Sequence, residues 1–180
     1  MNCGIFIDLD ETLVYSARVG SEYSTARKLI ALPGAKQFIY DNREKWVTFK
    51  RNGVDEFLTG CKTLAPTYIL TSGNKLFQDI ILQQHGIHGV QLFGRQEYDK
   101  LPKHELNILV DDLDIRTMGV QLKMACLCPE LMTDQINKEN PKRFQLVQVK
   151  PWYNPVPEKA LTDALTQVRS IIRPEVEISM

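Results

Sequence analysis

Two aspartates stand two residues apart directly after a short apolar run near the N-terminus. Residues 5–12 read Ile-Phe-Ile-Asp-Leu-Asp-Glu-Thr, so Asp8 and Asp10 follow a segment typical of a buried strand. In open α/β sheets, ligands bind beyond the carboxyl ends of the strands. Two carboxylates this close repel each other unless a cation or a shared proton separates their charges. A divalent metal, with one carboxylate as nucleophile and the other as protonated acid, would resolve the repulsion, and this is the chemistry of an aspartyl-phosphate enzyme. The alternative is a solvated turn that caps the next helix.

Two further apolar runs, 68–70 and 108–110, end in polar side chains suited to phosphate chemistry. Thr71 and Ser72 follow the first run, and Asp111 and Asp112 follow the second. Right-handed crossovers between parallel strands bring the carboxyl ends of those strands to one edge of a sheet, so we expect the three sets to converge. Taken alone, the acidic pair could equally cap a helix.

Two lysines, Lys100 and Lys103, lie just before the third run and could approach the same edge. Carboxylates that hold Mg²⁺, a hydroxyl and an ammonium are the components that phosphoryl transfer needs.

The rest of the chain alternates between expected strands and expected helices. The patterns predict strands at 3–8, 45–51, 68–70, 90–93, 108–110 and 144–149, and helices at 54–62, 75–84 and 158–172. Residues from about 15 to 45 are polar and irregular, and residues from about 128 to 143 are expected to be a surface excursion. This alternation predicts an α/β fold with a mostly parallel sheet wrapped by helices.

Bulk composition limits the classes of function. A chain of 180 residues suits one domain, and its 22 basic and 22 acidic residues give a net charge of zero, which gives no support to a nucleic-acid or membrane role. No long apolar span and no basic leader segment are visible, so we expect a cytoplasmic protein. One residue separates Cys126 from Cys128, a spacing that does not fit zinc, and we expect reduced thiols with no disulfide or zinc site.

The order of these motifs resembles the haloacid dehalogenase (HAD) superfamily. More narrowly, residues 8–14 (Asp-Leu-Asp-Glu-Thr-Leu-Val) and 50–58 (Lys-Arg-Asn-Gly-Val-Asp-Glu-Phe-Leu) resemble the small C-terminal-domain phosphatases, the FCP/SCP or NIF-type branch. Residues 147–153 and the segment after them resemble that branch's last strand and helix. Asn52 stands where the branch has proline. The likeness leaves out about residues 17–45 and 117–143.

The resemblance implies a role for each matching residue. Asp8 would be the nucleophile. Asp10 would protonate the leaving oxygen and then deprotonate water, and its main-chain carbonyl would bind Mg²⁺. Thr71 would bind phosphoryl oxygens, and Asp112 would complete the Mg²⁺ site with support from Asp111.

The charge-neutralising lysine and the substrate contacts are assigned less directly. Lys100 is our choice for the lysine, and Lys103 is the alternative. The interval from Lys100 to Asp111 leaves little room for a full helix. We expect Thr12, which would also hold the first turn, to contribute to substrate binding together with Ser72, Lys103 and Arg51; Arg51 could instead be a solvated residue at a strand end.

These expectations describe a Mg²⁺-dependent phosphomonoesterase with a Rossmann-like HAD core in a single domain. A flap or β-hairpin is expected at about 15–52, a surface insertion at about 117–143, and no large cap. An open site admits macromolecular substrates, and the resemblance favours phosphoserine or phosphothreonine in a protein.

Two alternatives remain open. The first is a polynucleotide-end or nucleotide phosphatase, which a basic face would favour; its candidate residues are Lys28, Lys36, Arg43, Lys45, Lys50 and Arg51. The second is a HAD-like binding module that has lost catalysis.

Overall fold

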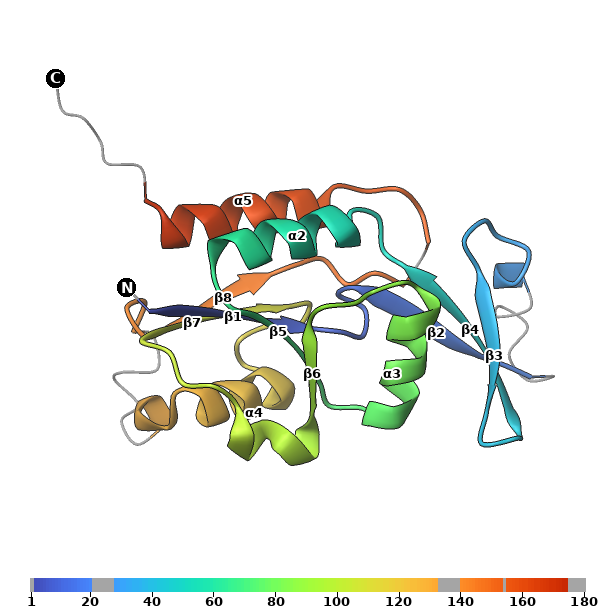
Figure 1. Cartoon of the computed structure of the whole chain (residues 1–180), viewed down its shortest axis with the longest axis horizontal. Coiled ribbons are helices and arrows are strands. Elements are labelled where there is room, and N and C mark those ends of the chain that lie inside the picture. The colour runs from blue at the N-terminus through green and yellow to red at the C-terminus, as the bar shows by residue number, and fades with distance from the viewer. Residues whose placement is uncertain (1, 21–27, 133–139, 154, 175–180) are drawn as a thin grey trace, which may run out of the picture.

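Five parallel strands form the central sheet of the molecule (Figure 1). The computed structural model describes residues 2–20, 28–132, 140–153 and 155–174. The strands lie in the order β6 (Gln91–Gly94), β5 (Thr67–Thr71), β1 (Cys3–Asp8), β7 (Leu106–Asp111) and β8 (Phe144–Gln148). Every neighbouring pair is parallel, which confirms the predicted α/β class with a mostly parallel sheet.

Helices cover both faces of this sheet. Helices α2 (Val54–Leu64), α3 (Lys75–Gln84) and α5 (Ala160–Ile172) contribute to the core on one face, while α4 (Met118–Leu127) and a 3₁₀ helix (Arg95–Lys100) pack on the other. Figure 1 shows α2 and α5 side by side above the sheet and α4 below it. Within the described part of the chain, no helix has the length and apolar character needed to cross a bilayer.

Strand β1 supplies both cores because its side chains alternate between the two faces. Ile5 and Ile7 join the cluster beneath α2 and α5, and Phe6 joins the cluster against α4. All three side chains are fully buried, and burial of each contributes about 1.5–3 kcal/mol to folding. The strand that carries the candidate nucleophile is therefore fixed from both sides.

A second, smaller sheet lies at one end of the molecule (Figure 1). It is antiparallel, in the order β2 (Val14–Val19), β4 (Glu44–Lys50) and β3 (Lys36–Tyr40). Three aromatic rings from this sheet, those of Phe38, Tyr40 and Trp46, have centroids 5.3, 5.1 and 4.9 Å from the ring of Phe77 on α3. The small sheet is thus packed against the helix that follows β5, and the described residues contain no large cap domain.

The sequence pattern placed no strands at β2 and β3, although both lie almost entirely within the flap or β-hairpin expected at about 15–52. In β3, exposed and half-buried residues alternate, and its turn to β4 uses positive φ angles at Asp41 (53°) and Asn42 (56°). These values suit the tight hairpin turn that joins two antiparallel strands. Part of the expected flap, residues 21–27, lies outside the described residues.

The expected surface insertion at 117–143 is wrong for its first half. Helix α4 packs into the core through Val120, Met124 and Leu127, all buried against the sheet. Its helical period is hard to see because apolar residues also occupy other faces, including the exposed Met118. The remaining part of this expectation, residues 133–139, lies outside the described residues.

The four cysteines are free thiols, and Cys3, Cys61 and Cys128 are buried. Burial raises the pKa of the Cys61 thiol to about 12. This sulfur therefore stays protonated and packs as a small apolar group.

Candidate active site

Three strand ends meet at one edge of the central sheet, as the sequence predicted. Asp8 ends β1, Thr71 ends β5 and Asp111 ends β7. The register pairs Asp8 with Leu70 on one side and Ile7 with Val110 on the other, so the residues that follow these strands leave the sheet at similar heights. The edge gathers carboxylates from two strands and a hydroxyl from a third.

The turn after β1 is held by main-chain bonds and by Thr12. The amide of Leu13 donates to the carbonyl of Leu9 at 2.9 Å, and Glu11 adopts a positive φ of 64°, which a non-glycine residue rarely does. The hydroxyl of Thr12 donates to Asp112 Oδ1 at 3.2 Å. Thr12 is fully buried, and its expected contact with substrate stays a prediction. Thr12 thus connects the turn after β1 with the acidic pair at the end of β7.

An acidic cluster forms where β1 and β7 end. One carboxylate oxygen from each of Asp8, Asp111 and Asp112 lies within 4.8 Å of the others, and all three residues are buried. Burial raises the pKa of Asp8 well above its usual value; Lys123 opposes this rise, and the neighbouring Asp111 adds to it. Burial followed by the proximity of Asp111 raises the pKa of Asp112 as well. Such a cluster requires positive charge to stay ionised.

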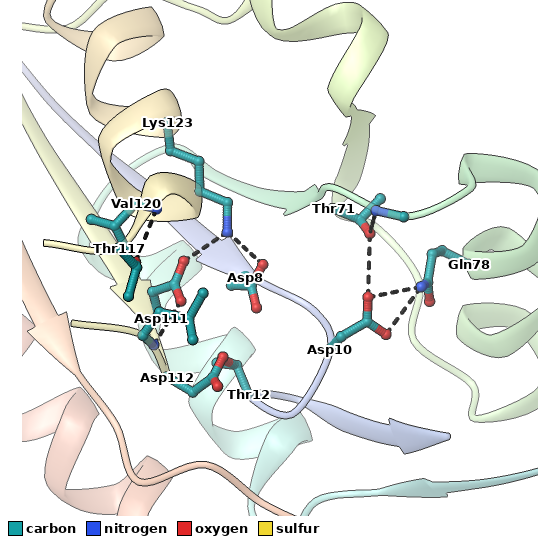
Figure 2. Close-up of polar contacts among 12 residues, drawn as sticks. Asp8, Asp10, Thr12, Thr71, Gln78, Asp111, Asp112, Thr117, Val120 and Lys123 are labelled. Atoms are coloured by element: carbon teal, nitrogen blue, oxygen red, sulfur yellow. Dashed lines mark hydrogen bonds and ion pairs between the residues drawn. The ribbon is translucent and has the colours of Figure 1, made fainter. Parts of the chain in front are cut away.

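Lys123 supplies positive charge at this cluster, and we did not predict it from the sequence. Its Nζ donates to Asp8 Oδ1 at 2.6 Å and to Asp111 Oδ2 at 2.7 Å (Figure 2). The residue is 2% exposed. Burial acts to lower the pKa of Lys123, but the carboxylates of Asp8 and Asp111 outweigh this effect and raise it. The ammonium is therefore charged and lies against the candidate nucleophile.

The position of Lys123 on α4 follows from the start of that helix. Thr117 caps α4 by accepting a hydrogen bond from the amide of Val120 at 3.4 Å. Lys123 then lies one turn along from Val120, on the same buried face as Met124 and Leu127. A lysine in an otherwise apolar stripe is the signal that could have identified it, because an unpaired charge there would be costly.

Lys100 and Lys103, the predicted lysines, both lie outside the cluster. Lys100 ends the 3₁₀ helix and is exposed. Lys103 is also exposed, and its Nζ donates to the carbonyl of Cys126 at 2.7 Å. The family motif order places the expected lysine upstream of β7. Lys123, which contacts the cluster, lies on the helix downstream of β7.

Asp10 is held by Gln78, a residue that the sequence reasoning also missed. The Nε2 of Gln78 donates to Asp10 Oδ1 at 3.0 Å and to Oδ2 at 2.9 Å (Figure 2). Thr71 Oγ1 lies 3.5 Å from Asp10 Oδ2 and accepts a hydrogen bond from the amide of Gly73 at 3.0 Å. Burial raises the pKa of Asp10, while the bonds from Gln78 and Thr71 oppose the rise. A raised pKa is what a carboxyl needs in order to act as an acid.

Gln78 reaches Asp10 because of the way α3 begins. Asn74 caps α3 by accepting hydrogen bonds from the amides of Leu76 and Phe77 at 2.9 and 3.3 Å. Gln78 is then placed on the buried face with Ile81 and Leu82, at 3% exposure. Like Lys123, Gln78 is a polar residue on an otherwise apolar helix face, and this pattern could have identified it from the sequence. Ser72, in contrast, is exposed beside this turn.

Arg51 is buried and bound within the fold, and this argues against its predicted substrate role. The residue is 1% exposed, and its Nε donates to Glu158 Oε1 at 2.7 Å. Its other nitrogens donate to the main-chain carbonyls of Glu11, Thr12 and Lys150 at 3.4, 3.1 and 2.7 Å. Arg51 thus holds the turn after β1 against the segment after β8 and acts as a structural clamp.

The residues present suit a divalent cation. Asp112 Oδ2 is buried and has no hydrogen-bond partner among the described residues, so it is an oxygen that a cation would satisfy. Carboxylate oxygens are the ligands that Mg²⁺ prefers. Lys123 donates to one oxygen of Asp8 and to one oxygen of Asp111. Of the three carboxylates, those of Asp8 and Asp112 are the best placed to hold a metal.

The sequence matches the model of a known protein family. The model of the NLI interacting factor-like phosphatase family matches residues 4–177. No curated protein matches the sequence.

Similar solved structures include two of the RNA polymerase II CTD phosphatase Fcp1. The fission yeast protein bound to beryllium fluoride is 13% identical with a TM-score of 0.51, and the alignment covers 95% of this chain and 50% of that one. A second Fcp1 structure is 14% identical with a TM-score of 0.52, covering 93% of this chain and 50% of the other. The chain spans about half the length of these structures, and the likeness establishes a shared fold.

Proposed function

Because the chain belongs to the NLI interacting factor-like phosphatase family, we propose that it hydrolyses phosphoserine or phosphothreonine in a protein substrate through a phosphorylated Asp8. The observation that carries this proposal is the contact of Lys123 Nζ with Asp8 Oδ1 at 2.6 Å. An ammonium held against a buried carboxylate keeps that carboxylate ionised and offers positive charge to an incoming phosphoryl group.

In the first step, a carboxylate oxygen of Asp8 attacks phosphorus. A bond forms between this oxygen and phosphorus while the bond to the ester oxygen breaks, and Asp10 gives its proton to the leaving oxygen. The raised pKa of Asp10, caused chiefly by burial, supports this role. Lys123 stabilises the negative charge that builds up on the phosphoryl oxygens.

In the second step, water attacks the phosphorus atom of phosphorylated Asp8. Asp10, now ionised, takes a proton from this water, and the bond between phosphorus and Asp8 breaks to release inorganic phosphate. Gln78 donates to both oxygens of Asp10 and suits the ionised form that the first step leaves. Thr71 remains our candidate for a contact with the phosphoryl group, because its hydroxyl lies 3.5 Å from Asp10.

We propose Mg²⁺ as the cofactor. Asp8 and Asp112 would hold the ion with their side chains, the main-chain carbonyl of Asp10 would add a ligand, and Asp111 would support the site through its bond to Lys123. The bound ion supplies positive charge that draws the phosphoryl oxygens toward Asp8 and lowers their repulsion with the carboxylates. The unpartnered, buried Oδ2 of Asp112 supports this assignment.

A macromolecular substrate suits a site without a large covering domain among the described residues. The nucleic-acid alternative depended on a basic face, but Arg51 is buried and Lys50 forms an ion pair with Asp55 at 2.8 Å. These two residues therefore contribute little to a surface for nucleic acid, and a phosphoprotein is the substrate class that we propose.

The experiment measures phosphate release from a phosphoserine peptide and from oligonucleotides phosphorylated at the 3′ or 5′ end. Each substrate is tested with Mg²⁺ and with EDTA, using the wild type, Asp8→Asn, and Asp163→Asn as a control at an exposed aspartate on α5. We expect Mg²⁺-dependent release from the peptide that Asp8→Asn abolishes and Asp163→Asn leaves intact. Release that survives Asp8→Asn contradicts the mechanism, and faster release from an oligonucleotide contradicts the substrate class. No release from any substrate would favour a binding module.

A further inference from the structure

A cavity of about 510 Å³ opens beside the candidate acid. It lies between the turn after β5 and the 3₁₀ helix after β6, and its lining residues are Ser72, Gly73, Asn74, Lys75, Leu76, Gly94, Arg95, Gln96 and Glu97. Gly73 connects it with the site, since a Cβ at that position would lie 3.6 Å from Asp10 Oδ2 and 3.3 Å from Thr71 Oγ1. Such a volume is typical of ligand sites.

The position of Asp10 indicates what enters this cavity. The carboxylate of Asp10 points away from Asp8 toward Thr71 and Gln78 (Figure 2). Gly73, which lines the cavity, lies on this side of Asp10. An acid must lie within hydrogen-bond reach of the oxygen that it protonates. The group attached to that oxygen therefore leaves on the Asp10 side, whereas Asp8 and Lys123 face the phosphorus atom from the other side.

We propose that this cavity binds the part of the peptide attached to the leaving oxygen, and that it selects an acidic residue close to the phosphorylated one. This inference rests on the proposed phosphatase function and adds a sequence preference to it. Arg95 is the residue that would bind the acidic side chain.

The charges that line the cavity leave Arg95 without a counter-ion. Lys75 Nζ lies 2.8 Å from Glu97 Oε2, and the amide of Gly94 donates to the same oxygen at 3.0 Å. The hydrogen bonds from Lys75 and from this amide hold the pKa of Glu97 below its usual value, so that carboxylate is ionised and already satisfied. Arg95 is exposed and forms no ion pair with any described residue. Its planar guanidinium can bind a carboxylate through two parallel hydrogen bonds.

The same lining disfavours a nucleic-acid leaving group. Proteins that bind unpaired bases stack them mainly on aromatic side chains, and the cavity lining contains no aromatic residue. The largest apolar side chain in it is Leu76, which is 71% exposed. Amide, hydroxyl and charged groups instead match the main chain and polar side chains of a peptide.

The test compares three phosphoserine peptides that differ only in one neighbouring residue, which is aspartate, asparagine or lysine, placed in turn before and after the phosphoserine. For the wild type we expect kcat/KM for the aspartate peptide to exceed that for the lysine peptide by about three- to tenfold at one of these positions, as for a partly exposed ion pair. The preference shrinks as salt is added, because ions screen an exposed contact. Arg95→Gln reduces the ratio toward one, and Arg95→Glu reverses it. Arg169→Gln, at an exposed arginine on α5, keeps the wild-type ratio.

The outcomes distinguish a failure of the acidic preference from a failure of the phosphatase function. Equal hydrolysis of all peptides by the wild type, or an unchanged preference in Arg95→Glu, overturns the inference and leaves the phosphatase function standing. Failure of the wild type to hydrolyse any phosphopeptide overturns both. The ratio between peptides is the informative quantity, because a general loss of folding lowers all rates together and does not reverse a preference.

Discussion

Gln78 donates hydrogen bonds to both carboxylate oxygens of Asp10, at 3.0 and 2.9 Å, from a side chain that is 3% exposed. These contacts fix the direction of the candidate acid relative to the leaving group. A catalytic group that is turned away from its target loses much of its effect even when the residue itself is unchanged.

Replacing Gln78 is therefore expected to affect substrates that depend on the acid. We expect Gln78→Leu to lower kcat for a phosphoserine peptide, a poor leaving group, by about 10- to 100-fold. The loss for p-nitrophenyl phosphate is smaller, since its leaving group needs no proton. Gln83→Leu, at an exposed glutamine on the same helix, is the matched control. Equal losses on both substrates would show that Gln78 serves the fold alone.

Lys123 is expected to be the lysine on which activity depends. Lys123→Met removes the positive charge that stabilises the phosphoryl oxygens during transfer. We therefore expect it to lower kcat/KM by about 100-fold or more. Lys103→Met, at an exposed lysine, keeps activity within about twofold. Circular dichroism of each variant checks that the fold is retained. The account is wrong on this point if Lys100→Met abolishes activity and Lys123→Met does not.

Arg51 is expected to matter for stability. Arg51→Met removes four hydrogen bonds and leaves Glu158 without the guanidinium of Arg51. We therefore expect the free energy of unfolding to fall by about 3 kcal/mol in urea denaturation. Arg43→Met, at an exposed arginine in the hairpin turn, changes it by less than about 0.5 kcal/mol. A raised KM with unchanged stability would instead restore the substrate role predicted from the sequence.

His85 is expected to make stability depend on pH. Burial, with smaller effects from Lys50 and Lys36, lowers its pKa from 6.5 to about 4, and Thr48 Oγ1 lies 2.8 Å from its Nε2. Between these pH values the unfolded chain binds a proton that the folded chain does not, so this residue stabilises the fold above pH 6.5 and loses that contribution as the pH falls toward 4.

The size of this effect is about 1–3 kcal/mol. The unfolding free energies of the wild type and of His85→Gln are compared at pH 7 and again at pH 4.5. The carboxylates titrate in both proteins, so their contribution cancels in the difference at each pH. The stability advantage of the wild type should shrink at the lower pH. An advantage that stays constant would mean that His85 titrates normally.

The sequence was sufficient to predict the strands that carry the acidic motifs. Strand β1 matches the prediction at 3–8, and α3 matches it at 75–84, because each is a strongly patterned segment next to a clear turn signal. The positions of Asp8, Asp10 and the Asp111–Asp112 pair followed from those strands and from the parallel topology.

The residues that the prediction missed share a physical cause. Lys123 and Gln78 are polar residues on helix faces that are otherwise buried, and their partners lie 115 and 68 residues away in the chain. Such pairs depend on tertiary packing, which local patterns do not encode. The family motif order also pointed to Lys100, which precedes β7, whereas Lys123 follows it. Polar side chains within apolar stripes were the available clue.

Detection of a phosphoryl group on Asp8 would be the most direct evidence for the proposed mechanism. Asp10→Asn is mixed with p-nitrophenyl phosphate and Mg²⁺, quenched in acid, digested and mapped by mass spectrometry. This substrate needs no acid for the first step, whereas the second step lacks its base, so the phosphorylated enzyme accumulates. The account predicts a hydroxylamine-sensitive phosphoryl group on the peptide that contains Asp8. A phosphoryl group on another residue, or none in an enzyme whose wild type releases phosphate, would contradict it.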